Sequence, residues 1–219
     1  MTTITAHAGA LGTAPNTPES LRACLEFVGR GVVEVDLRFD RDGRPVLSHD
    51  KPGETAFPLE DCLRVAQAYE ASFNLDLKEY GSLTAVRELI ERYNMAGRAF
   101  FTGLPGAKQV MAVRGCGIPW YLNVSPPRWL PFAAGMAARR AKSLGAVGLN
   151  LPYRRCGKAV VRAARRSGLL VSVWTVDDPA DMARMLRLGV DNITTRRPDI
   201  LRDFMALPHP TTSIPSTVK

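Results

Sequence analysis

Strand-like and helix-like segments alternate along the whole of this 219-residue chain. Short runs rich in Val, Ile and aromatic residues predict strands, and stretches with apolar residues three or four positions apart predict helices. Such alternation is typical of a parallel sheet in which each helix leads back to the next strand. We count eight strand–helix units, at roughly 25-residue spacing, and eight units close naturally into a (β/α)8 TIM barrel.

Single residues mark several element boundaries. Thr17 and Pro18 are typical of a helix cap and first turn, and Gly189 is typical of the residue that ends a helix. The pair Asp42-Gly43 predicts a turn, after which the chain returns as an extended arm over residues 45–49. We expect strands over residues 4–8, 32–39, 72–78, 99–102, 118–124, 146–151, 169–175 and 191–194, and helices over residues 18–28, 59–69, 83–93, 107–113, 129–143, 158–166, 179–188 and 200–205.

We expect one α/β domain, because a chain of this length buries a single large core. The barrel would span residues 1–207, and residues 208–219, which are rich in Pro, Ser and Thr, would form a disordered tail. An open doubly wound sheet is the alternative architecture. It is disfavoured because no Gly-rich dinucleotide-binding sequence follows the first predicted strand.

The net charge of +8 first suggests a nucleic-acid partner. The basic residues are dispersed, however, and their densest groups lie on or beside predicted helices without aromatic residues between them, which argues against nucleic-acid binding. A mild positive field that attracts a small anionic ligand fits better, with transient contact to an anionic membrane surface as a secondary use.

Cysteine spacing and hydropathy indicate the compartment. Cys24, Cys62, Cys116 and Cys156 have neither a metal-binding nor a disulfide pattern, so we expect them to be core residues of a reducing environment. The apolar runs are too short to cross a bilayer, and no secretory signal opens the chain. We therefore expect a cytoplasmic protein without a transmembrane segment.

Polar side chains recur at every second position of the predicted strands. Glu34 and Asp36 share one face of their strand, and Asp76 and Lys78 share one face of the next, whereas apolar residues occupy the opposite faces. The pattern continues at His7, Tyr121, Asn123 and Trp174. Polar residues on the inward face, near the carboxyl ends of strands, mark the active-site mouth of such a barrel.

Three of these inward residues, Glu34, Asp36 and Asp76, are carboxylates on adjacent strands. At low dielectric they would repel one another strongly unless a cation lay among them. Oxygen ligands alone suit Mg2+ or Ca2+ better than zinc. The alternative is a structural ion network in which Lys78 and Arg38 neutralise the acids.

The chain has three histidines, and His209 lies in the expected tail. His7 and His49 both fall where strands end at the expected mouth, one on each side of the Glu34 and Asp36 pair. Two histidines beside a carboxylate cluster suit an acid and a base that work on opposite sides of a phosphorus centre, with a metal stabilising the developing charge.

Together these residues resemble the glycerophosphodiester phosphodiesterase family, which belongs to the phosphatidylinositol-phospholipase-C-like barrels. The resemblance runs from His7 to Pro198. Its segments are residues 6–9 (Ala-His-Ala-Gly), 15–17 (Pro-Asn-Thr), 33–36 (Val-Glu-Val-Asp), 42–50 (Asp-Gly-Arg-Pro-Val-Leu-Ser-His-Asp), 74–78 (Asn-Leu-Asp-Leu-Lys), 173–176 (Val-Trp-Thr-Val) and 189–195 (Gly-Val-Asp-Asn-Ile-Thr-Thr). Each segment alone is weak evidence, but their order and spacing are specific.

The resemblance implies hydrolysis of glycerophosphodiesters with one divalent cation, Mg2+ or Ca2+. His7 and His49 match the family's acid–base pair, and Glu34 and Asp36 match two metal ligands. Asp76 stands where the family usually has a glutamate as third ligand. In the implied mechanism a hydroxyl of the substrate attacks phosphorus, a cyclic phosphate forms, and water opens it.

The resemblance also implies contacts to the substrate. Lys78 matches a lysine that contacts the phosphate, and Trp174 matches an aromatic residue that lines the pocket. Independently of the resemblance, the inward positions of Tyr121 and Asn123 predict that they touch substrate.

Besides Asp76, this chain departs from the family pattern in three further places. The arginine that usually follows the first histidine is Ala8, and we expect Arg38 or Arg154 to replace it as a phosphate donor. The usual glutamate before Asn-Thr is absent, since Pro15 precedes Asn16. The insertion after the His-Asp motif is nearly absent, which predicts a small lid or none and an open site.

Two alternatives to this function remain open. The Asp-x-Lys pattern of Asp76 and Lys78 also resembles the sphingomyelinase D and phospholipase D branch of the same barrel, which acts on lipids, although its long loops and disulfides are missing here. A barrel that has lost catalysis and only binds a phosphorylated ligand is the other alternative, motivated by Ala8 and Asp76.

Overall fold

The computed structural model describes residues 2–103, 107–127 and 132–206. The tail predicted over residues 208–219, His209 within it, and Trp129 at the predicted start of a helix lie outside the described residues.

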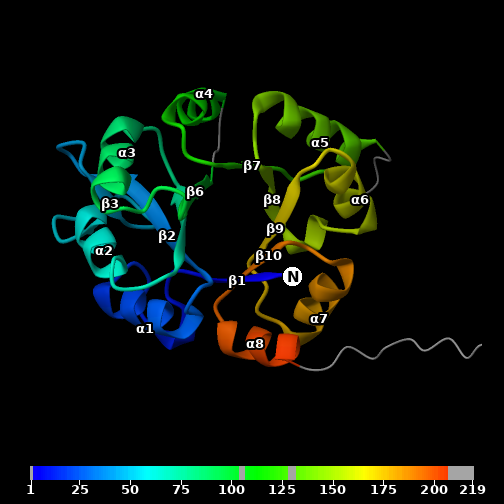
Figure 1. The fold of residues 1–219 in the computed structure, drawn as a ribbon, viewed down its shortest axis with the longest axis horizontal. Coiled ribbons are helices and arrows are strands. Elements are labelled where there is room, and N and C mark those ends of the chain that lie inside the picture. Colours follow the sequence, from blue (N-terminus) through cyan, green and yellow to red (C-terminus); the bar gives the residue numbers. More distant parts are fainter. Residues whose placement is uncertain (1, 104–106, 128–131, 207–219) are drawn as a thin grey trace, which may run out of the picture.

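Eight parallel strands form a ring that helices surround (Figure 1). Hydrogen-bonded ladders join all neighbouring pairs in the ring except β6 and β7, which meet through one isolated bridge, Phe101 to Trp120. The strands, in their order around the ring, are β1 (Thr3–Ala6), β2 (Val32–Phe39), β5 (Ser72–Leu77), β6 (Ala99–Thr102), β7 (Tyr121–Asn123), β8 (Gly148–Pro152), β9 (Leu170–Trp174) and β10 (Asn192–Thr195). The predicted (β/α)8 barrel is confirmed.

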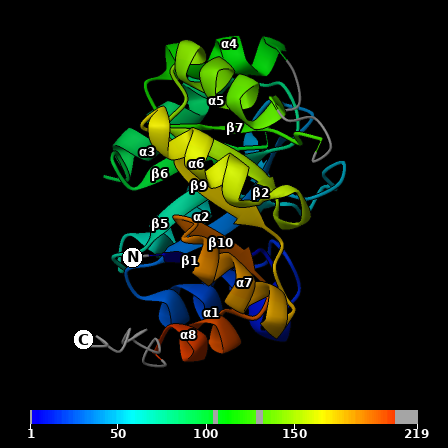
Figure 2. The ribbon, with the colours of Figure 1, turned by 90° about the vertical axis from the view of Figure 1, so that its right-hand side faces the viewer.

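Each ring strand is followed by an α-helix on the outside of the barrel (Figures 1 and 2). The helices are α1 (Pro18–Val28), α2 (Leu59–Ala66), α3 (Leu83–Arg92), α4 (Ala107–Cys116), α5 (Ala133–Leu144), α6 (Lys158–Arg166), α7 (Pro179–Leu188) and α8 (Pro198–Ala206). The Thr17 hydroxyl caps α1 by accepting a hydrogen bond from the Ser20 N–H, as predicted. Gly189 ends α7 with a φ of 69°, a left-handed conformation that favours glycine.

An antiparallel arm extends the ring at the end of β2. The short strand β3 (Pro45–Leu47) pairs with β2, with Leu37 opposite Leu47, and β4 (Phe57–Pro58) pairs with β3. The arm therefore places the residues after Leu47 beside the carboxyl end of β2. The extended arm was predicted, whereas the two-residue strand β4 was not.

The two faces of the ring strands differ in chemistry. Outward residues such as Val35, Leu37 and Leu75 are buried beneath the helices and build the main core. Inward residues are mostly polar yet also buried, and they satisfy one another, as where Asn192 accepts from the Thr5 hydroxyl and donates to Ser172. The predicted alternation is confirmed, and the polar interior leads up to the mouth.

Some predicted boundaries were wrong. The strand predicted over residues 118–124 is reduced to Tyr121–Asn123, because Pro119 has no N–H to donate and interrupts the ladder. Two short 3-10 helices, η1 (Ala10–Gly12) and η2 (Tyr153–Arg155), were not predicted. Among the helices in the described part of the chain, none combines the length and apolar composition that a membrane crossing requires.

Candidate active site

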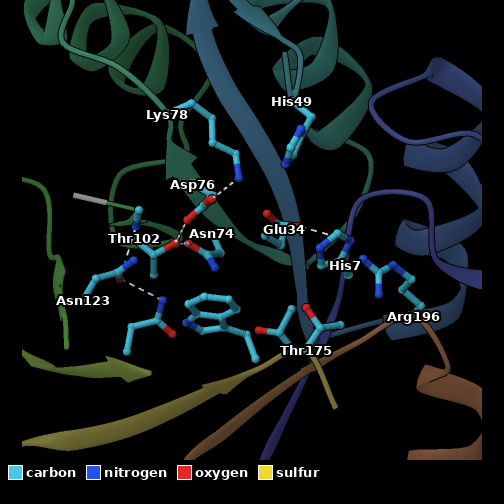
Figure 3. Close-up of a pocket in the computed structure, with 14 residues that line it drawn as sticks. His7, Glu34, His49, Asn74, Asp76, Lys78, Thr102, Asn123, Thr175 and Arg196 are labelled. Carbon is cyan, nitrogen blue, oxygen red and sulfur yellow. Dashed lines mark hydrogen bonds and ion pairs between the residues drawn. The ribbon is translucent and has the colours of Figure 1, made fainter. Parts of the chain in front are cut away.

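A cavity of about 450 Å3 opens at the carboxyl ends of the ring strands (Figure 3). Parallel strands in a barrel all present their carboxyl ends to this one mouth, so side chains from distant parts of the sequence meet there. The lining residues are His7, Glu34, His49, Asn74, Asp76, Lys78, Thr102, Gly103, Asn123, Asn150, Trp174, Thr175, Thr194 and Arg196.

The three predicted carboxylates come together on the adjacent strands β2 and β5. Asp36 pairs with Asp76 in the strand register, and Glu34 lies one pleat earlier on the same face. One oxygen from each of the three lies within 4.8 Å of the others. Oxygens bound to one Mg2+ or Ca2+ lie up to about 5 Å apart, so the spacing fits a single hard cation.

Neighbouring groups hold Glu34 and Asp36 in place. The Ala8 N–H donates to Glu34 Oε2 at 2.8 Å. The Asn16 side chain makes a reciprocal pair with Asp36, donating to Oδ2 at 2.7 Å and accepting from the Asp36 N–H at 3.1 Å. Asp36 is only 1% exposed and lies beneath the cavity lining. Both side chains therefore have fixed orientations before any ligand arrives.

Lys78 neutralises part of the cluster. Its ammonium lies 2.7 Å from Asp36 Oδ1 and 2.6 Å from Asp76 Oδ2. Burial first, and then repulsion from Asp36 and Asp76, raises the pKa of Glu34 well above its usual range. One ammonium cannot neutralise three carboxylates, and a divalent cation would compensate the negative charge that remains. The ion network weighed above is thus formed in part by Lys78, and the donor set still fits a cation.

Asp76 is set by its neighbours on β6. The Thr102 hydroxyl lies 2.6 Å from Asp76 Oδ1 and 2.8 Å from Asn74 Oδ1, and its one proton can serve either oxygen. Gly103 follows at a φ of 76°, and a Cβ there would lie 2.6 Å from Asp76 Oδ1. Any larger residue at position 103 would therefore displace the carboxylate from the cluster.

His7 lies directly after β1 with its ring at the edge of the carboxylate cluster (Figure 3). Its Nδ1 lies 2.6 Å from the Ala8 carbonyl oxygen, which can only accept, so Nδ1 carries the proton and Nε2 keeps its lone pair. Burial is the largest effect on this ring and lowers the pKa of His7 below its ordinary value. His7 is therefore neutral at neutral pH.

His49 lies on the loop after β3 and lines the same cavity as His7 and Glu34 (Figure 3). Its Nδ1 is 3.0 Å from Asp50 Oδ1, and its side chain is 65% exposed. The Arg38 guanidinium donates to the His49 carbonyl oxygen at 2.9 Å and so ties this loop to the end of β2. Both predicted histidines therefore line the cavity together with Glu34.

Two predicted substrate-contacting residues lie away from the cavity lining. Arg38 forms an ion pair with Glu79 at 2.8 Å in addition to its bond to the His49 carbonyl. Tyr121 is 8% exposed, and its ring packs against Phe100 with 5.2 Å between centroids. Burial raises the pKa of Tyr121 to about 12. Neither side chain is among those that line the cavity.

Arg196 is a lining residue that the sequence reasoning missed. It follows β10, which pairs with β1, and the His7 N–H donates to the Thr195 carbonyl oxygen, so Arg196 lies beside His7 (Figure 3). Asp177 holds its guanidinium at 2.9 Å and its backbone N–H at 2.8 Å. The signal available in the sequence was an arginine directly after the last strand, at the mouth.

Lys78, Asn123 and Trp174 do line the cavity, as predicted. The Asn123 amide oxygen accepts from the Asn150 amide at 2.9 Å, and the Trp174 side chain is 37% exposed. Arg154, the other residue considered as a phosphate donor, lies over the Tyr153 ring and does not line the cavity.

Known proteins similar to this chain share one activity in their names. The sequence profile of the glycerophosphoryl diester phosphodiesterase family matches residues 118–200. A Mycobacterium tuberculosis protein named "Probable glycerophosphodiester phosphodiesterase 2" is 26% identical over 81% of this chain and 80% of its own length.

Solved structures share the fold. A glycerophosphodiester phosphodiesterase from Agrobacterium tumefaciens superposes with a TM-score of 0.74 at 19% identity, over 93% of this chain and 100% of its own. An Oleispira antarctica phosphodiesterase, solved in complex with the product sn-glycerol-3-phosphate, gives a TM-score of 0.79 at 19% identity, over 93% and 96% of the two chains. Profile and relatives thus show that this chain is similar to the glycerophosphoryl diester phosphodiesterase family, and the solved structures show that it shares their fold.

Proposed function

We propose that this protein is a metal-dependent phosphoric diester hydrolase that cleaves glycerophosphodiesters into an alcohol and glycerol 3-phosphate. The observation that carries the proposal is the carboxylate cluster of Glu34, Asp36 and Asp76 flanked by His7 and His49 around one cavity. The similarity of the chain to the glycerophosphoryl diester phosphodiesterase family supports the same activity.

We assign Glu34, Asp36 and Asp76 as the ligands of one divalent cation, which when bound stabilises negative charge that develops on the phosphoryl oxygens. An all-oxygen donor set favours Mg2+ or Ca2+ over softer ions. Asn16 and the Ala8 N–H orient two of the three ligands, a role that outer partners commonly have at metal sites.

We assign His7 as the general base and His49 as the general acid. His7 is neutral and has a free Nε2 lone pair, so it can accept the proton of the attacking hydroxyl. His49 lines the same cavity and is exposed to solvent, so we assign it to protonate the departing alkoxide. Attack by the neighbouring hydroxyl of the glycerol gives a cyclic phosphate, and water then opens the ring with the two roles exchanged.

We assign Lys78 and Arg196 as the cations that hold the phosphoryl group. Lys78 lines the cavity beside the carboxylates, and Arg196 lines it beside His7. Because Asp177 pairs with the NH1 atom of Arg196, other N–H groups of the guanidinium remain to contact an anion. Arg196 thus supplies from the end of β10 the positive charge that Ala8 cannot supply.

Soluble diesters fit the site better than intact lipids. Most of the residues that line the cavity carry polar side chains, and Trp174 is the one large aromatic side chain among them. We assign Trp174, together with Asn123, to contact the alcohol part of the substrate. We also place the protein in the cytoplasm, supported by four buried, unpaired cysteines that suit a reducing compartment.

The test is a turnover assay on metal-depleted protein given Mg2+ or Ca2+. The panel contains glycerophosphocholine and related soluble diesters, and lysophospholipid and sphingomyelin vesicles. We expect glycerol 3-phosphate, or its cyclic ester, from the soluble diesters. Turnover of the vesicles alone would instead support the lipid-active branch, and metal binding by calorimetry without any cleavage would support a barrel that only binds its ligand.

A further inference from the structure

Acidic residues are absent from a long stretch of the chain. Residues 92–176 contain 14 Lys or Arg and no Asp or Glu. The rest of the chain holds the other 15 basic residues together with all 21 acidic ones. The net charge of +8 is therefore the sum of a strongly basic segment and a net acidic remainder.

The fold converts this separation along the sequence into a separation in space. Residues 92–176 run from the end of α3 to the loop after β9 and include α4, α5 and α6, which follow one another around one side of the barrel (Figure 1). Figure 2 shows α5 and α6 together on that side. The acidic side chains lie on the other elements.

A groove of about 220 Å3 runs between α5 and α6. Arg139 of α5 and Arg162 and Arg166 of α6 line it, and its floor is built from small residues. All three arginines are exposed, and among the described residues none of them forms an ion pair. Their positive charge is thus uncompensated, in contrast to Arg64, Arg87 and Arg92, which pair with carboxylates.

Large apolar side chains lie beside these arginines. Phe132, which also lines the groove, is 75% exposed, and Met136 is 57% exposed. The two are four residues apart at the start of α5, so they point to the same side of the helix. Because a helix that follows a barrel strand begins at the carboxyl end of that strand, both lie at the end of the barrel that carries the cavity.

We propose that the α5–α6 face, defined as Phe132, Met136, Arg139, Arg162 and Arg166, docks this protein on an anionic phospholipid bilayer. Arginines without acidic partners complement lipid phosphates, and exposed Phe and Met side chains enter the interface between head groups and acyl chains. The phosphates of a nucleic acid would also bind these arginines, but binding to phosphates does not explain the exposed apolar side chains beside them. Docking brings the mouth close to a surface from which deacylated lipid head groups are released.

The experiment is co-sedimentation of the full-length protein with vesicles of phosphatidylcholine alone and of phosphatidylcholine mixed with phosphatidylglycerol. We expect binding to the anionic vesicles only, and weaker binding as salt screens the charges. The double variant Arg139→Glu/Arg162→Glu should lose at least about 30-fold in partitioning, since each basic residue near such a surface contributes a factor of about five.

A second variant separates the apolar contribution from the charge. Phe132→Gln/Met136→Gln leaves the charge unchanged and should weaken the binding that persists at high salt. The matched control is Arg22→Glu/Arg187→Glu, which makes the same change of charge at exposed positions of α1 and α7, outside the acid-free segment. This control should reduce vesicle binding far less than the Arg139/Arg162 variant.

Equal losses from the two charge-reversed variants would overturn the proposal, because binding would then follow net charge and not this face. Tighter binding to a duplex oligonucleotide than to anionic vesicles, lost in the Arg139/Arg162 variant, would assign the face to nucleic acid and also overturn it. None of these residues lines the cavity, so turnover of a soluble diester should be unchanged in every variant and reports separately on the proposed catalysis.

Discussion

Arg196 and Arg197 are adjacent in sequence, but only the Arg196 side chain lines the cavity. Arg196 lines the cavity beside His7, whereas Arg197 pairs with Asp199 at 2.8 Å and does not line it. We predict that Arg196→Met raises KM for a soluble diester and lowers kcat/KM by about ten- to a hundredfold, the usual cost of losing a hydrogen bond to a charged group. Arg197→Met is the control and should change kcat/KM little; equal effects would remove Arg196 from the phosphate site.

The titration of the Tyr121 phenol reports on the burial of its side chain. Because burial favours the neutral phenol, the pKa rises from 10.0 to about 12. A raised folded-state pKa contributes stability that is complete below pH 10 and is lost as the pH rises through about 12. We predict that one of the five tyrosines titrates late by phenolate absorbance, and that Tyr121→Phe removes this late step.

The same variant bears on substrate contact. Tyr121→Phe should leave kcat/KM within a factor of about three, because the ring lies outside the cavity lining. A large rise in KM would return Tyr121 to the substrate-contacting set that its strand position first indicated.

For single residues, the sequence predicts the position of a side chain where the two-residue period of a strand decides which face it occupies. Alternation along β2 and β5 predicted that Glu34, Asp36 and Asp76 share a face, and the register of the two strands brings them together. Arg38 has the same parity as Asp36 but lies past the last inward position, where Glu79 and the His49 carbonyl bind its side chain. Asn16 and Arg196 reach the site from loops, and loop positions depend on contacts that no local pattern encodes.

Among the elements, the antiparallel arm decides where His49 lies. Arg38 links the end of β2 to Glu79 and to the His49 carbonyl, so it acts on the site through the arm and not by touching substrate. We predict that Arg38→Met lowers kcat by about ten- to a hundredfold with little change in KM, because a small displacement of an acid–base group costs this much.

Two further variants check that positioning role. Arg38→Lys keeps one donor for the His49 carbonyl and should recover part of kcat. Arg44→Met, in the same arm, removes only exposed pairs with Asp40 and Asp42 and serves as the control. A rise in KM alone for Arg38→Met would show that Arg38 contacts substrate after all.

Element identity was predictable from the sequence, whereas several element ends were not. The predicted bounds of α1, β2, α6 and α7 agree with the structure because caps and glycines mark them chemically. The two-residue strand β4 has no period of its own, and it forms because β3 offers it a ladder. Such pairing is a tertiary effect and cannot be read from the segment itself.

At the scale of the whole molecule, a bound divalent cation would reduce the electrostatic repulsion among Glu34, Asp36 and Asp76. Lys78 compensates only part of the three carboxylates, so bound Mg2+ or Ca2+ should stabilise the folded state selectively. At a hundredfold excess over Kd this contributes about 2.7 kcal/mol, which for a chain of this size raises Tm by roughly 5–10 °C.

The measurement is differential scanning calorimetry after chelation and after either ion is added back. Asp76→Asn should reduce the stabilisation, whereas Asp61→Asn, on the surface of α2, should keep it in full. If neither ion changes the Tm, Lys78 would be the sole partner of the carboxylate cluster, and a purely structural ion network would be favoured.

The central claim is that the cation site and the two histidines act together on a glycerophosphodiester. The most direct measurement is 31P NMR of glycerophosphocholine incubated with the protein, with chelator or with Mg2+, and with the His7→Asn and His49→Asn variants. We predict that the diester signal is replaced by that of glycerol 3-phosphate only when the cation is present, and that each variant is slower by about 100- to 10,000-fold. A diester signal that persists with the wild-type protein and either cation, or that disappears as fast in the two histidine variants as in the wild type, would contradict this account.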